Sequence, residues 1–138
     1  MSINKWQAKY LLAGAVILPL APFLYVQGQI TRWKVGLLPE AADPEGVAGE
    51  GDSEARLLVL GESTVAGLGA RTHELALGGQ FALGLSERIG KRVSWKVVGR
   101  NGVTARRTID ELWPLVPDRE FDYVLLGIGG NDVMKLSS

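Results

Sequence analysis

The stretch Arg56–Gly69, RLLVLGESTVAGLG, determines the fold that we expect for this chain. Residues 57–60 are an unbroken apolar run, as expected of a strand that is buried on both faces of a parallel sheet. The run stops at Gly61, and a turn of small residues that includes Ser63 follows. Because open α/β sheets bind ligands beyond the carboxyl ends of their strands, Ser63 is the candidate nucleophile.

Two further segments, 93–98 and 121–128, are predicted to be strands of the same sheet. Helices are expected between the strands, at about 74–89 and at 105–113. Strands and helices therefore alternate along the chain, which predicts an α/β fold with right-handed parallel crossovers.

The first 38 residues contain a long apolar segment, 10–26, which carries no charge. Its 17 residues reach the lower limit for a membrane-spanning helix, about 17 to 25 residues. We therefore interpret residues 1–38 as a membrane anchor with its flank. A cleaved signal peptide, which would leave a secreted or periplasmic protein, and a buried core helix are the alternatives. Basic residues flank both ends of the segment, so the side of the membrane on which the rest of the chain lies is undetermined.

Residues 39–54 have six acidic residues, no basic ones and scarcely any large apolar side chain. Such a segment buries too little surface to order itself, so we expect an acidic flexible linker. It contains a triplet, Gly51-Asp52-Ser53, that resembles an esterase motif. No strand is predicted before this triplet, and we reject Ser53 as a site residue.

The composition excludes several classes of function. Fifteen basic and fifteen acidic residues cancel, which argues against a nucleic-acid partner. With no cysteine and one histidine among 138 residues, disulfides, thiolate metal sites and multi-histidine metal sites are excluded within this chain. We expect no metal and no organic cofactor. The oligomeric state is left open.

Three polar clusters follow the three predicted strands: Ser63, the Asn101–Gly102 turn and the pair Asn131–Asp132. In a parallel sheet these clusters meet at one edge. Acyl transfer needs a nucleophilic hydroxyl together with donors that face the developing oxyanion. The backbone amides of Ser63 and Gly102 and the side-chain amide of Asn131 are the candidate donors.

These clusters resemble the sequence blocks of the SGNH hydrolases, also called GDSL esterases and lipases. The first block corresponds to Gly61-Glu62-Ser63 with Gly67 downstream, the second to Gly102, and the third to Gly129-Gly130-Asn131-Asp132. The resemblance covers Arg56 to the end of the sequence, and we expect the partial hydrolase domain to span residues 55–138. The resemblance implies a flavodoxin-like three-layer α/β/α fold in strand order 2-1-3, with Ser63 as nucleophile and Gly102 and Asn131 in the oxyanion hole. It also implies a small-molecule, lipid or carbohydrate ester as substrate.

The sequence departs from the family in two ways. Glu62 stands where the family has aspartate, and the Asp-x-x-His block that supplies the general base is absent from the 138 residues. The strand 121–128 would also be an exposed apolar edge. We therefore expect the domain to be truncated after its third strand. A non-catalytic ligand-binding module and a membrane-anchored structural protein are the alternatives.

Other residues have simpler interpretations. We expect His73 to be a solvated loop residue rather than a replacement base. Asp132 is expected to orient its loop or cap a helix, and Arg106 and Arg107 to lie on a solvated helix face. For Ser63 the simplest alternative is that its hydroxyl caps the next helix.

Overall fold

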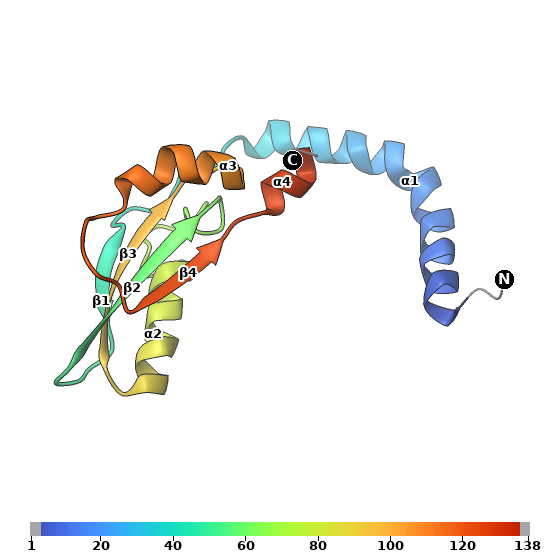
Figure 1. The fold of residues 1–138 in the computed structure, drawn as a ribbon. Helices are drawn as coiled ribbons and strands as arrows, with labels where there is room; N and C mark the ends of the chain where they lie inside the picture. Colours follow the sequence, from blue (N-terminus) through green and yellow to red (C-terminus); the bar gives the residue numbers. More distant parts are fainter. Residues whose placement is uncertain (1–3, 136–138) are drawn as a thin grey trace. The chain divides into compact units, whose positions relative to one another are not determined.

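The computed structural model describes residues 4–135, without the side chains of Val16 and Lys135. The chain divides into two compact units, Met1–Leu38 and Pro39–Ser138. The first contains α1 (Lys5–Val35), and the second contains a four-stranded sheet with helices (Figure 1). The division falls at the residue where the sequence predicts the end of the N-terminal segment.

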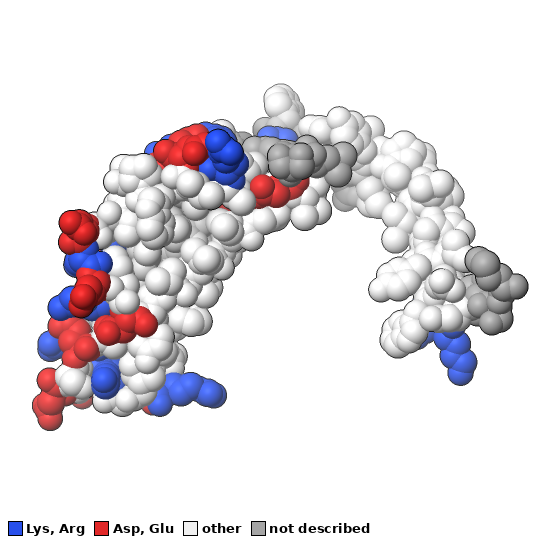
Figure 2. All heavy atoms as spheres, in the orientation of Figure 1, with Lys and Arg blue, Asp and Glu red and all other residues white. Residues whose placement is uncertain are grey.

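Helix α1 begins with a capping box in which the Asn4 side chain accepts from the Trp6 amide at 2.6 Å and the Gln7 side chain accepts from the Asn4 amide at 3.1 Å. Its surface is uncharged over most of its length (Figure 2). Helix α1 is bent by 50° between two parts, Lys5–Ala15 and Ile17–Val35. In residues 4–135 no single straight helix has the length and hydropathy of a membrane span, but these two parts together meet both conditions. The bend adjoins Ala15, whose carbonyl has no helical donor because Pro19 lacks an N–H.

The sheet has the strand order β1-β3-β2-β4. Strand β2 (Glu54–Gly61) lies at its centre and pairs in parallel with β3 (Arg92–Gly99) and β4 (Tyr123–Gly127). The three predicted strands and their parallel pairing are confirmed. The fourth strand, β1 (Glu45–Ala48), pairs antiparallel with β3.

The interpretation of 39–54 as a flexible linker is wrong. Residues 45–48 form β1, and the segment belongs to the second unit. Backbone hydrogen bonds hold much of this segment: the β1–β3 ladder is extended by the Val97 amide, which donates to the Pro44 carbonyl at 2.7 Å. Polar composition alone does not exclude such an edge strand, because ladder hydrogen bonds need no side chain.

Alternating residues of β2 enter two cores, one on each face of the sheet. Leu57 and Val59 pack with α2 (Leu77–Ile89), whereas Leu58 and Leu60 pack with Leu112. The helical segment that carries Leu112 lies on the opposite face of the sheet from α2 (Figure 1). The central strand is therefore buried on both faces, as its apolar run predicts.

Both helices between the strands differ from their predicted forms. Helix α2 begins at Leu77 rather than at 74, and it ends at Ile89, after which Gly90 is left-handed with φ 65°. The predicted helix at 105–113 is α-helical only in α3 (Ala105–Arg107). It continues as a π-helical turn, η1 (Thr108–Leu112), and a 3-10 turn, η2 (Trp113–Leu115). Pro114 has no N–H to donate to the Asp110 carbonyl, so a regular α-helix cannot continue there.

Strand β4 forms the outer edge of the sheet, as expected from the sequence. Val124 and Leu126 are 56% and 58% exposed, although their register partners Leu58 and Leu60 are buried. After this strand the chain enters a short helix, α4 (Gly130–Lys135).

Candidate active site

The three parallel strands end in a row of glycines. Gly61 is in register with Gly99 on one side and with Gly127 on the other. A Cβ atom at Gly99 would lie 2.7 Å from the Ala66 nitrogen, and one at Gly127 would lie 2.7 Å from the Val65 side chain. The loop after β2 therefore packs directly onto bare backbone at this edge of the sheet.

Ser63 lies in the turn that this glycine row supports. The Glu62 amide donates to the Gly127 carbonyl at 2.9 Å, and the Ala66 amide donates to the Glu62 carbonyl at 2.8 Å. Ser63 itself is half-buried, and the next helix, α2, has no side-chain hydrogen bond at its N-terminus. The Ser63 hydroxyl therefore does not cap this helix, and it lies at the carboxyl end of the central strand.

The carboxylate of Glu62 holds the loop that follows β4. Its Oε1 atom accepts from the Gly130 amide at 3.1 Å, and its Oε2 atom accepts from the backbone amide and the side-chain Nδ2 of Asn131 at 3.0 and 2.8 Å. A Cβ atom at Gly130 would lie 2.6 Å from Glu62 Oε1, so the glycine leaves room for the longer acid. This role of Glu62 was not predicted from the sequence. The only signal was an acid directly before the candidate nucleophile.

The side-chain amide of Asn131 joins the three turns. Besides Glu62, it donates to the Val103 carbonyl at 3.0 Å. Ser63 follows Glu62 and Gly102 precedes Val103, so both candidate residues adjoin a partner of Asn131. The predicted gathering of the three clusters at one sheet edge is therefore observed. An amide nitrogen carries two hydrogens, and both are engaged in these two bonds.

The Asn101–Gly102 turn has the backbone geometry expected of a turn glycine. Gly102 has a φ of +75°, a conformation that side chains other than glycine rarely adopt. A Cβ atom there would meet no other atom within 4 Å, so the conformation rather than space favours glycine. The preceding amide, that of Asn101, donates to Glu40 Oε1 at 2.7 Å.

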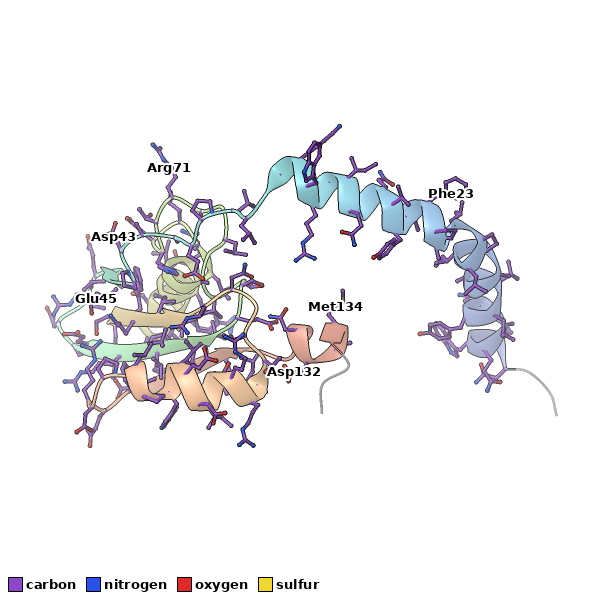
Figure 3. The ribbon with its side chains drawn as sticks, turned by 90° about the horizontal axis from the view of Figure 1, so that it is seen from above. Phe23, Asp43, Glu45, Arg71, Asp132 and Met134 are labelled. Atoms are coloured by element: carbon purple, nitrogen blue, oxygen red, sulfur yellow. The ribbon has the colours of Figure 1, made fainter. Side chains whose placement is uncertain are left out.

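Asp132, which is labelled in Figure 3, caps a helix, as predicted. Its carboxylate accepts from the Ala105 amide, the first of α3, at 2.9 Å. A carboxylate is favoured at this position because the helix N-terminus carries partial positive charge. Arg106 and Arg107 are exposed, as expected, and pair with Asp110 and Glu111 one turn along the helical segment.

A shallow, open depression lies beside Ser63 and has a volume of about 370 Å³. Its lining is small and mostly apolar, and it contains no charged side chain: Ser63, Thr64, Gly67, Leu68, Ala70, Ala76 and Leu77. In residues 4–135 no cluster of three or more histidines and acids is arranged to hold a metal ion.

The interpretation of His73 as a solvated residue is wrong. Its side chain is only 4% exposed, and its Nδ1 atom has no hydrogen-bond partner in the described chain. Burial lowers the pKa of His73, while the charges of Glu40 and Asp43 oppose that shift. His73 is not among the residues that line the depression beside Ser63.

No family model, curated protein or solved structure matches this chain.

Proposed function

We propose that this chain carries the nucleophile and the oxyanion-binding turns of an SGNH-type serine hydrolase with a flavodoxin-like fold. The observation that carries the proposal is the bridge from the Asn131 amide to Glu62 and Val103. This bridge links the loop of the candidate nucleophile to the two other loops that the family resemblance singles out. The substrate would be a carboxylic ester of a small molecule, lipid or carbohydrate.

In the proposed reaction, the Ser63 oxygen attacks the ester carbonyl carbon, and the electron pair moves to the carbonyl oxygen. The amides of Ser63 and Gly102 stabilise that oxyanion. Its collapse expels the alcohol and leaves an acyl-serine, which water then hydrolyses to the free acid. The resemblance assigns the proton transfers to the histidine of the Asp-x-x-His block, which the 138 residues do not contain, and we assign no other base.

The test is covalent labelling of the full-length protein with a serine-directed fluorophosphonate. We expect labelling of the native protein, its loss in Ser63→Ala, and normal labelling in Ser53→Ala. Ser53 is the matched control because it lies in the similar triplet Gly51-Asp52-Ser53 but directly precedes β2 instead of following it. Equal labelling of the native protein and Ser63→Ala would refute the proposal.

A ligand-binding module without turnover is the second candidate. It is favoured by the state of Asn131, whose two amide hydrogens already bond Glu62 and Val103 and so do not reach an oxyanion. This function predicts that a short-chain ester binds to the full-length protein saturably and is recovered intact. Equilibrium dialysis followed by mass spectrometry of the ester separates the two functions, since release of the acid requires catalysis.

For residues 1–38 we propose a membrane anchor, with a cleaved signal peptide as the alternative. The proposal is supported by the length and hydropathy of the bent pair Lys5–Ala15 and Ile17–Val35. The intact mass of the protein from its native cells, together with its fractionation, tests this assignment. An uncleaved N-terminus in an alkali-resistant membrane fraction is expected. A mature N-terminus located after the apolar segment 10–26 would instead identify a signal peptide and a secreted or periplasmic protein.

A further inference from the structure

Residues 39–44, which we call the strap, lie along the loop that follows the candidate nucleophile. The Gly69 amide donates to the Pro39 carbonyl at 2.9 Å, and the Ala41 amide donates to the Ala66 carbonyl at 3.0 Å. Further along, the Ala42 amide donates to the Arg71 carbonyl at 3.2 Å. Figure 3 labels Asp43 in the strap and Arg71 in the loop. These three hydrogen bonds hold the strap against the loop.

The strap also contacts the loop through close packing. Gly67, with φ +65°, has room for no side chain, since a Cβ atom there would lie 2.8 Å from the Ala41 Cβ. His73 is buried in the same region, and its amide donates to the Ala42 carbonyl at 2.8 Å. Asp43 adopts a φ of +55°, which is uncommon for a residue other than glycine. Such a conformation persists only where surrounding contacts fix it.

The strap reaches a second turn through the side chain of Glu40. Its Oε1 atom accepts from the Asn101 amide at 2.7 Å, across 61 residues of sequence. The next residue is Gly102, whose amide is a proposed oxyanion donor. The strap therefore connects the two loops whose backbone amides must face the same oxygen atom during acyl transfer.

We propose that the strap sets the relative position of these two loops and that Glu40 is the positioning residue for the Gly102 amide. This inference rests on the proposed hydrolase function. Glu40 itself does not touch the substrate and acts through the Asn101 N–H. An amide oxygen at position 40 can accept the same bond, although a carboxylate accepts it more strongly, so the proposal depends on the length and the acceptor of the side chain rather than on its charge.

The test compares Glu40→Ala, Glu40→Gln and Glu45→Ala in the full-length protein. Glu45 is the matched control, because it is the acid that directly follows the strap, at the start of β1, and its side chain pairs with Lys96 on the sheet at 3.7 Å. Two quantities are measured for each variant: the rate of fluorophosphonate labelling at Ser63 and the exchange rate of the Asn101 amide by NMR. Thermal unfolding verifies that each variant is folded.

We expect Glu40→Ala to slow labelling roughly ten-fold, because a displaced donor weakens oxyanion stabilisation. Asn101 exchange should rise by a similar factor in this variant. Glu40→Gln should restore both rates to within about two-fold of the native values, since an amide oxygen still accepts the bond. Glu45→Ala should leave both unchanged.

Two outcomes overturn the inference. Native labelling in Glu40→Ala would show that Glu40 does not position the site, and failure of Glu40→Gln to rescue would show that the charge acts instead. A native protein that is not labelled at Ser63 refutes the proposed function. In that case faster Asn101 exchange in Glu40→Ala still shows that the strap holds the turn, so the two failures are distinguishable.

Discussion

The two parallel neighbours of the central strand have similar sequences and very different surroundings. On one side, β3 is covered by β1 and by α2, and Val97 is 3% exposed. We call this side the closed edge. On the other side, β4 is the open edge, and Val124 is 56% exposed. Both strands pair with β2 in register, and both end in glycine.

The difference shows that an apolar run predicts a strand, whereas the burial of that strand also depends on the segments that cover it. Val93–Val98 and Phe121–Ile128 are both rich in β-branched or aromatic residues. What distinguishes them is the cover supplied by other segments, and on the closed edge part of that cover comes from the polar residues 39–48. Burial is thus a property of the neighbours as much as of the strand.

The largest expected difference between the edges is in the free energy of unfolding after the same substitution. Val97→Ala should destabilise the protein by about 2 kcal/mol, because a buried side chain loses two methyl groups and leaves a cavity. Val124→Ala should change the stability by at most about 0.5 kcal/mol, as for an exposed position. Urea unfolding measures both. Similar losses for the two variants would mean that the open edge is covered in solution.

A smaller effect is expected for two glycines of α2. A Cβ atom at Gly78 would lie 2.6 Å from Val97 on the closed edge, so Gly78→Ala should destabilise the fold by about 1 to 2 kcal/mol. Gly84 has open space within 4 Å, and Gly84→Ala should stabilise the helix by about 1 kcal/mol. Thermal unfolding measures the change in stability of both variants, and the two changes should have opposite signs. A stabilising Gly78→Ala would disprove the close approach of α2 to β3.

The smallest expected effect is a pH dependence that arises at His73, beside the strap. Because burial lowers its pKa in the folded state, the unfolded chain binds more protons below a pH of about 6.5. The contribution of His73 to stability is therefore complete above that pH, and it is lost as the pH falls through the folded pKa. An NMR titration of the His73 ring tests this directly. A midpoint at or above the usual value would mean that the strap does not bury the ring.

Much of the fold could be predicted from local pattern. Strong apolar signals are carried by the runs that end at Gly61 and Gly99 and by the segment around Leu125. These signals predicted three strands, and the helical segments between them predicted that the strands are parallel. Strand β1 was missed because Glu45–Ala48 has a single large apolar side chain, Val47. Its pairing depends on main-chain groups of β3, which a sequence pattern does not display.

The site was predictable in its positions and less so in its connections. Ser63, Gly102 and Asn131 follow strand ends, and topology alone brings strand ends together. The contacts of Glu62 and Glu40 were not predictable, because each joins residues more than 60 positions apart through one side chain. The burial of His73 was missed for the same reason, since the chain that covers it was taken to be disordered.

The glycine row at the carboxyl edge has a consequence for how this chain can vary. Gly61, Gly99 and Gly127 lie on three strands, yet each leaves space that the loop around Val65 and Ala66 or the neighbouring backbone fills. In a library of all single substitutions, these three positions should be depleted together, and even alanine should be rejected. A selection experiment on such a library would then identify, from the depleted positions alone, the residues of the sheet that the loop packs against.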